Sequence, residues 1–139
     1  MLFRSVFEYA TRDGEIRSEL EPKPGDIVAQ EHWCSSGFAN TDLDLPLKKH
    51  GIHKLIVIGL VAHTCGDATV RYAAELRYEV TTVRDATVNY SDRHMQVALV
   101  TKLSNYASVI VTTGKSSIRS LAAVHECGCV KGFRMTAVC

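Results

Sequence analysis

The sequence predicts an α/β domain of three layers, in which a mostly parallel sheet carries helices on both faces. Two observations lead to this fold class. Short apolar runs rich in β-branched residues, of which Leu55–Leu60 is the clearest, are typical of strands that are covered on both faces. Amphipathic stretches of helical length lie between these runs, and strands separated by such helices form right-handed βαβ units.

The first predicted elements are a short strand and a helix. The strand covers residues 26–29 and directly follows a Lys-Pro-Gly turn signal. Thr41 or Asp42 is a candidate N-cap for the helix, which runs to Lys49 and has Gly51 as its C-terminal stop.

The middle of the chain is predicted as strand, helix and strand. The strand over 55–60 leads into a helix over about 65–77, and a third strand covers 79–83. The polar residues 84–87 leave this strand as a loop at its carboxyl end. One face of the helix is predicted to be buried, because these residues recur at helical spacing: Cys65, Ala68, Thr69, Tyr72, Ala73 and Leu76.

The last predicted elements follow the same alternation. Ser91 is placed to cap a helix that runs to about Leu103, and residues 108–112 form a fourth strand. Ser116 opens a last helix, which ends at Ala123. Near the N-terminus, residues 6–10 have the composition of a strand that pairs at an edge of the sheet.

Length and charge limit the kind of protein. The chain has 139 residues, of which 46% are hydrophobic, enough for one compact domain over residues 1–125 with an irregular tail over 126–139. Its 16 basic and 15 acidic side chains form no long runs, so we expect neither a nucleic-acid partner nor a membrane partner. The longest apolar run is too short to span a bilayer, and a cytoplasmic location is expected.

The five cysteines form an odd set without regular spacing, which is typical of reduced thiols rather than of a disulfide framework. His125, Cys127 and Cys129 lie close enough in sequence to suggest a metal site. A zinc site takes four ligands, and a Cys-x-Cys pair does not supply them. We therefore predict no metal and no other cofactor.

Cys65 is the strongest candidate for chemistry, because it lies where a buried strand ends and a helix begins. Unpaired amide N–H groups and the positive end of the helix dipole stabilise a thiolate at the first turn of a helix. The thiolate is the nucleophilic form of cysteine. The alternative interpretation is a small buried residue without reactivity.

A series of motifs resembles the isochorismatase-like cysteine hydrolases, a family that includes nicotinamidases and related amidohydrolases. Its order and spacing are specific over about residues 15 to 123, and the resemblance implies a Rossmann-like α/β topology. The motifs are Ser36–Asp44, Leu47, Gly51-Ile52, Gly59-Leu60, Cys65, Arg71–Leu76 and Val83–Ala86.

The resemblance implies a role for several residues. Cys65 matches the nucleophile, which attacks a carbonyl or similar carbon and forms a covalent intermediate that water resolves. The backbone amides of Val61 and Cys65 match the oxyanion hole, and the peptide between Leu60 and Val61 matches one that is cis in the family. Trp33 and Phe38 match a pocket loop, where they are placed to stack on a planar substrate.

The sequence departs from the family at two places. The family lysine, six residues before the phenylalanine that matches Phe38, is replaced by His32, which is a candidate base or polariser. The apolar strand that ends in Asp-x-Gln and opens the family domain is absent, so the fold is expected to be N-terminally shortened. Strands around residues 27 and 57 are then expected to have exposed edges.

Two more polar residues lie near the predicted site. His63 is either a residue that borders the pocket or a solvated turn histidine. Asp85 follows a strand at the end where α/β sheets build their sites, and a structural Asx-type bond is the alternative role.

Two classes of function stay open. The first is a cysteine hydrolase that acts on a small amide or vinyl-ether substrate through Cys65. The second is a non-catalytic relative that serves as a binding or assembly subunit. On the resemblance and the exposed edges, a homodimer or larger homo-oligomer is expected in both cases.

Overall fold

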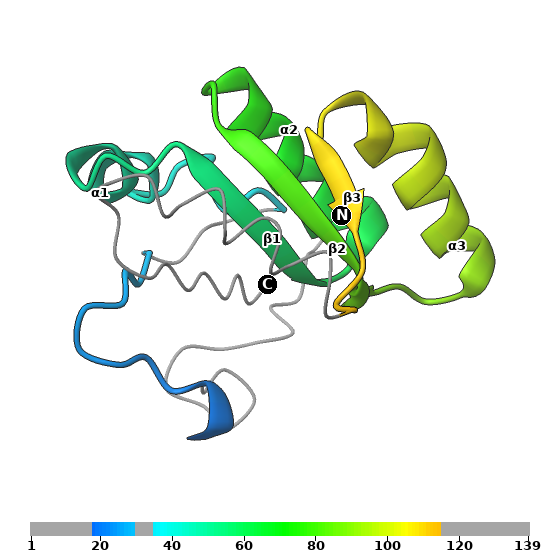
Figure 1. Cartoon of the computed structure of the whole chain (residues 1–139), viewed down its shortest axis with the longest axis horizontal. Helices are drawn as coiled ribbons and strands as arrows, with labels where there is room; N and C mark the ends of the chain where they lie inside the picture. Colours follow the sequence, from blue (N-terminus) through cyan, green and yellow to red (C-terminus); the bar gives the residue numbers. More distant parts are fainter. Residues whose placement is uncertain (1–17, 30–34, 115–139) are drawn as a thin grey trace, which may run out of the picture.

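The computed structural model describes residues 18–29 and 35–114, and it confirms an α/β fold with a parallel sheet (Figure 1). The strands are β1 (Lys54–Leu60), β2 (Glu79–Val88) and β3 (Val109–Val111), in the order β1-β2-β3. The helical segments are η1 (Ser18–Leu20), α1 (Asp44–Lys49), η2 (Ala62–Gly66), α2 (Asp67–Glu75), α3 (Asp92–Gln96), η3 (Val97–Lys102) and η4 (Leu103–Asn105).

The described crossover helices lie on the same face of the sheet. Figure 1 shows α2 and α3 side by side along the three strands. Right-handed crossovers require this arrangement when successive strands are added in one direction. Ser91 caps α3 as predicted, since its side chain accepts a hydrogen bond from the His94 backbone N–H.

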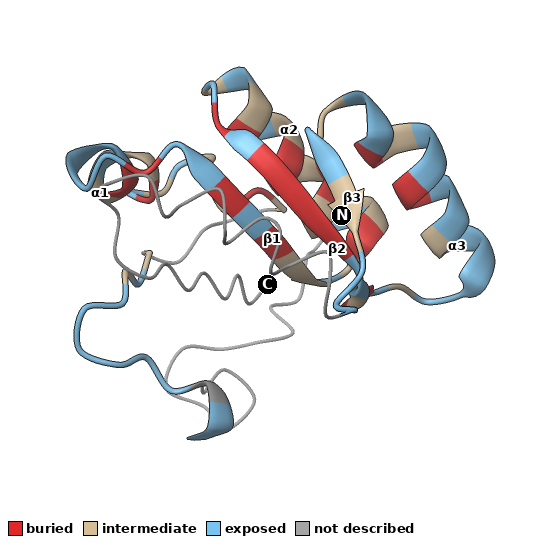
Figure 2. Cartoon of the chain, in the orientation of Figure 1, coloured by how far each residue is buried: buried red, intermediate tan, exposed pale blue. Residues whose placement is uncertain are grey.

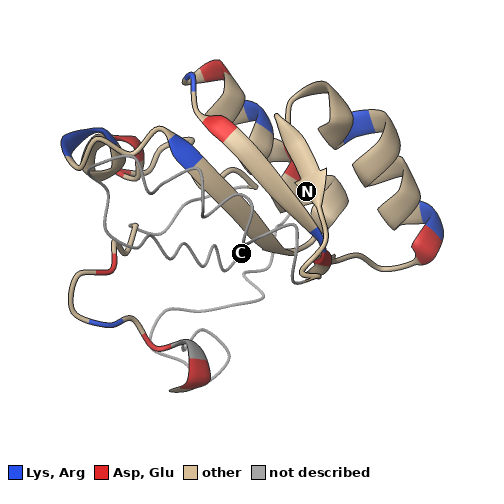
Figure 3. Cartoon of the chain, in the orientation of Figure 1, with Lys and Arg blue, Asp and Glu red and all other residues tan. Residues whose placement is uncertain are grey.

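The register of β1 and β2 has a charged pair at its start and an irregularity near its end. Lys54 lies opposite Glu79, and their side chains form an ion pair of 2.9 Å between Nζ and Oε2. Figure 3 shows that charged residues of the sheet lie near the ends of the strands. Between Val57 and Gly59 the register shifts, so that Gly59 pairs with Thr87.

The prediction of a loop over 84–87 is wrong, because β2 continues past the register shift and through these residues to Val88. Arg84 and Asp85 are exposed at the irregularity, so this part of the strand has the polar composition that is typical of a loop. Figure 2 shows that β2, the middle strand, is buried along much of its length before this point.

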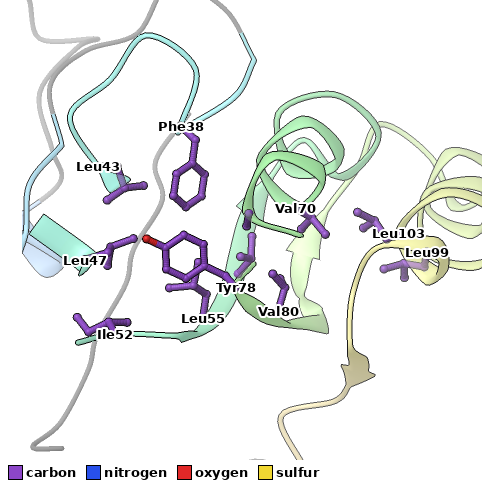
Figure 4. Packing of buried hydrophobic residues seen from close by; sticks show 12 residues of the cluster. Phe38, Leu43, Leu47, Ile52, Leu55, Val70, Tyr78, Val80, Leu99 and Leu103 are labelled. Carbon is purple, nitrogen blue, oxygen red and sulfur yellow. The ribbon is translucent and has the colours of Figure 1, made fainter. Parts of the chain in front are cut away.

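The hydrophobic core has two parts that meet at β1 and β2 (Figure 4). On the crossover side, Val70 of α2 and Leu99 and Leu103 of the α3 side pack near Val80 of β2. The other part packs the segment around α1 against the start of the sheet, and its members are Phe38, Leu43, Leu47, Ile52, Leu55 and Tyr78.

The strand predicted over 26–29 does not form. Asp26 instead closes a local turn, because its carboxylate accepts a hydrogen bond of 2.8 Å from the Lys23 N–H and its own N–H donates to the Lys23 carbonyl at 2.9 Å. Such local bonds compete with sheet pairing. Ile27 and Ala29 still pack against the core.

The predicted cap of the first helix is also wrong. The helix α1 begins at Asp44, and its N-cap position is Leu43, which makes no side-chain cap bond. The Thr41 hydroxyl donates instead to the Gly37 carbonyl at 2.7 Å, so it closes the preceding loop. The segments predicted over 6–10, 116–123 and 126–139 lie outside the described residues.

Within the described residues, no helix is long and apolar enough to cross a membrane.

Candidate active site

The turn between β1 and α2 carries Cys65. The peptide between Leu60 and Val61 is cis, which confirms the geometry that the family resemblance implied. The chain then winds as a π-helical turn, η2, before α2 begins. Cys65 lies in η2, two residues before α2 begins, in agreement with its predicted place at or near the first turn of the helix. Wide turns of this kind occur often at functional sites.

The Val61 carbonyl closes the turn from inside. It accepts hydrogen bonds from the backbone N–H groups of Thr64 and Gly66, each at 3.1 Å. The Val61 backbone and the cysteine are thus held in one compact loop.

Cys65 is a free, half-buried thiol that borders a small cavity at the carboxyl end of β1 and β2. The Thr64 hydroxyl lies 3.8 Å from its Sγ atom. The cavity has a volume of about 20 Å³, roughly the room for one water molecule. Among the described residues, no charged side chain lines it, and its lining residues are Val57, Ile58, Gly59, Leu60, Cys65, Gly66, Thr69, Val70, Thr82, Thr87 and Leu103.

Three threonines line this cavity, and two of them have fixed partners. Thr69 Oγ1 accepts from the Gly37 N–H at 3.0 Å, and Thr87 Oγ1 donates to the Val83 carbonyl at 2.7 Å. Thr82 Oγ1 is buried without a hydrogen-bond partner among the described residues. In the described part of the chain, Thr82 is therefore a hydroxyl of this cavity that has no committed partner.

The ring of His63 lies among side chains from α3 and from the loop between β2 and α3. It stacks on His94 with centroids 5.0 Å apart and meets Tyr90 edge-on at 5.5 Å. Its Nδ1 atom lies 2.6 Å from Asn89 Oδ1. The sequence left His63 open between a pocket residue and a solvated histidine; the structure makes it a half-buried link to the next crossover.

A charged network supports the same turn from the helices. Lys102 Nζ donates to the His63 carbonyl at 3.4 Å and lies 3.7 Å from Asp67 Oδ2. Arg71 Nε donates to Asp67 Oδ1 at 3.0 Å, and its guanidinium also donates to the Tyr106 hydroxyl at 2.9 Å. The buried Asp67 carboxylate, two residues after the cysteine, is thereby paired with two cations.

The other predicted site residues are placed as follows. Phe38 is 6% exposed, and its ring packs on Tyr78 with centroids 5.5 Å apart, so a substrate contact by Phe38 stays a prediction. His32 and Trp33 lie outside the described residues. Asp85 has a structural role, but its partner is distant rather than the following loop of the predicted Asx-type bond: its carboxylate accepts hydrogen bonds from the Thr113 hydroxyl and backbone N–H, which lower its pKa.

Sequence reasoning missed Asn89, Tyr90 and Lys102 as neighbours of the cysteine turn. Each is far from Cys65 along the chain, and none has a motif of its own. The usable signal was topological, since parallel strands bring the loops at their carboxyl ends together.

No group of three or more histidine, cysteine or acidic side chains that could hold a metal ion occurs within residues 18–29 and 35–114. His125, Cys127 and Cys129 lie outside these ranges.

Comparison with known proteins decides the family. The model of the isochorismatase domain matches residues 3–115. The chain belongs to the isochorismatase family. Among curated relatives, the ureidoacrylate amidohydrolase RutB of Agrobacterium fabrum is 30% identical over 112 residues, which are 81% of this chain and 46% of that protein.

Solved structures agree with this assignment. An isochorismatase-like hydrolase from Alkaliphilus metalliredigens has a TM-score of 0.70 at 28% identity and covers 83% of this chain and 60% of its own. The N-carbamoylsarcosine amidase of Thermoplasma acidophilum has a TM-score of 0.62 at 29% identity, over 73% of this chain and 57% of its own. The chain thus spans about half the length of the relatives that it matches.

Proposed function

We propose that this protein hydrolyses a carbon–nitrogen bond of a small amide, with Cys65 as the nucleophile. The observation that carries the proposal is the position of the thiol, in the turn that directly follows β1 at the carboxyl end of a parallel sheet. The relatives named as an amidohydrolase and an amidase support amides over vinyl ethers as substrates.

The proposed reaction has two steps. The Cys65 thiolate attacks the amide carbon, a carbon–sulfur bond forms, and the carbon–nitrogen bond breaks as the leaving nitrogen takes a proton. Water then attacks the thioester, which releases the carboxylic acid and returns the thiol. Each step passes through an oxyanion on the former carbonyl oxygen.

The backbone N–H groups of Val61 and Cys65 are the proposed oxyanion donors. Support comes from the closed turn, in which the Val61 carbonyl is occupied by two internal hydrogen bonds and cannot turn toward a substrate without breaking them. A single preorganised donor of this kind typically stabilises a transition state by about 3 to 4 kcal/mol.

The remaining roles rest on the family resemblance alone. His32 is the proposed base or polariser, and Trp33 and Phe38 are the proposed contacts to a planar substrate. No cofactor is needed for this chemistry. The cytoplasm stays the expected location.

The decisive experiment measures the alkylation rate of Cys65 by iodoacetamide against pH, with the modified cysteine identified by peptide mass spectrometry. An inflection below about pH 7 supports an activated thiolate, whereas one near 8.5, the value of free cysteine, contradicts the proposal. Site-resolved detection is needed because the chain has five cysteines.

A panel of small amides and ureido compounds tests the substrate class. We expect hydrolysis by the wild-type chain and none by Cys65→Ala, while Cys65→Ser shows whether the hydroxyl of a similar side chain suffices. Cleavage of a vinyl ether without any amide cleavage would overturn the amide assignment while leaving Cys65 as nucleophile.

We also propose assembly into a homodimer or larger homo-oligomer. Support comes from β1, which within the described residues pairs only with β2 and leaves its second edge without a strand. Sedimentation velocity tests this, and a monomer at micromolar concentration would contradict it. A thiol of ordinary reactivity in a stable oligomer would favour the binding or assembly subunit instead.

A further inference from the structure

The hydrogen on the His63 ring can be assigned from its neighbours. Asn89 Oδ1 accepts a hydrogen bond of 2.9 Å from the backbone N–H of Tyr90, which identifies that side-chain atom as the oxygen rather than the nitrogen. His63 Nδ1 lies 2.6 Å from the same oxygen, which can only accept. Nδ1 therefore carries a hydrogen, and in the neutral ring Nε2 keeps the lone pair.

His63 is held by both its ring and its backbone. Asn89, Tyr90 and His94 contact the ring, and Lys102 donates to the carbonyl oxygen. All four partners belong to the crossover after β2, whereas His63 belongs to the turn after β1. The residue thus joins the two crossovers at the carboxyl end of the sheet.

The position of His63 in η2 decides how it can act on Cys65. Side chains two positions apart lie on roughly opposite sides of a helical turn. Cys65 borders the cavity, while the His63 ring points into the cluster around Asn89. His63 therefore acts through the backbone of the five-residue turn, which also carries the Cys65 N–H.

We propose that His63, through its Nδ1–H bond to Asn89, is a positioning residue that fixes the orientation of the cysteine turn and so sets the reactivity of Cys65. The inference rests on the proposed role of Cys65 as nucleophile. It assigns to Asn89 a supporting role, since its oxygen is the acceptor that orients the ring.

Two variants remove the bond from opposite sides. His63→Phe keeps a ring for His94 and Tyr90 but has no donor, and Asn89→Leu removes the acceptor. We expect each to slow the alkylation of Cys65 about tenfold, with kcat for amide hydrolysis lowered by a similar factor and KM little changed, as for the loss of one oriented hydrogen bond. Asn89→Asp keeps an acceptor oxygen, so we expect it to retain the wild-type rate.

Ser91→Ala is the matched control, because Ser91 caps α3 in the same loop and its hydroxyl lies 2.9 Å from His94 Nδ1, so the variant disturbs the stacking partner of His63 but removes neither partner of the His63–Asn89 bond. It is expected to lower Tm without changing the alkylation rate. All rates are measured at a temperature where circular dichroism shows each variant fully folded, so that loss of stability alone leaves them unchanged. At a pH where the ring is neutral, NMR of ¹⁵N-labelled wild-type protein should show the hydrogen on Nδ1 of His63 and the lone pair on Nε2.

The outcomes separate this inference from the proposed function. If the wild-type thiol reacts like free cysteine, the proposed function fails and this inference fails with it. If the wild-type thiol is fast but His63→Phe and Asn89→Leu are equally fast, or if NMR shows Nδ1 without hydrogen, only the positioning role is overturned. Equal slowing in Ser91→Ala would likewise overturn it, since the effect would then follow the loop as a whole.

Discussion

The two crossovers of the sheet begin in different ways. After β2, the chain runs through Asn89 and Tyr90 to Ser91, whose side chain caps α3. After β1, the chain turns at once at Val61, and no side chain of the described residues caps the turn that holds Cys65. A cap satisfies N–H groups that a helix start leaves unpaired. The first crossover thus leaves the N–H groups of its turn without a side-chain acceptor at the place of the proposed chemistry. The second crossover provides the contacts that hold this turn.

Removing the packing between the crossovers should have the largest effect. Leu103 is 1% exposed, belongs to the second crossover and lines the cavity beside Cys65. Leu103→Ala should lower the free energy of unfolding by about 2 to 5 kcal/mol, because it deletes buried apolar atoms and enlarges the cavity. Urea unfolding measures this. A loss below 1 kcal/mol would mean that the two crossovers are not packed together in solution.

The capping difference predicts unequal responses to removing a hydroxyl. Ser91→Ala should cost about 1 kcal/mol of unfolding free energy, since the cap of α3 is lost. Thr64→Ala in the first crossover should cost less than about 0.5 kcal/mol, because Thr64 is exposed and its hydroxyl bond to the Val61 carbonyl is long, at 3.4 Å. Denaturant unfolding curves of both variants measure these free energies. Equal losses of unfolding free energy would contradict the difference between the two crossovers.

The end of the first crossover offers a stabilising change. Arg77, just after α2, has φ 69°, a left-handed backbone that costs most residues about 1 kcal/mol. Its side chain is exposed, so Arg77→Gly should raise the free energy of unfolding by about 0.5 to 1 kcal/mol. Gly51, after α1, has φ 66° and provides the reverse control. Gly51→Ala should destabilise by a similar amount, and a rise in Tm would contradict the explanation.

Acid should act where β2 is joined to the chain that follows β3. Hydrogen bonds from Thr113 lower the pKa of Asp85 in the folded chain. Its contribution to stability is therefore present above about pH 3.9, the usual carboxyl value, and is lost as the pH falls through the lower folded pKa. In thermal unfolding between pH 2 and pH 6, Asp85→Asn should show a smaller decrease of Tm with acid than wild type. Parallel curves would show that Thr113 does not hold Asp85.

Sequence patterns predicted several local features, although not the cap of α1, where the Thr41 hydroxyl closes the preceding loop instead. The apolar run of β1, the Ser91 cap and the cysteine at the junction of strand and helix were all predicted, because each depends on a few consecutive residues. The fold class followed from their alternation. The strand over 26–29 failed for the opposite reason, since a strand needs a neighbour and Asp26 found a nearer partner in Lys23.

The candidate site also combines features that the sequence predicts with features that depend on contacts between distant segments. The sequence by itself determined that Cys65 follows a buried strand. The family resemblance added the Val61 backbone to the candidate site and implied the cis peptide before it. Only the tertiary structure decided that His63 is held by Asn89, 26 residues away, and that the ring of Phe38 lies against Tyr78 in the core. Contacts between distant segments depend on how the strands are paired. The register of β1 and β2 shifts after Val57, and neither strand's own sequence shows where that shift falls.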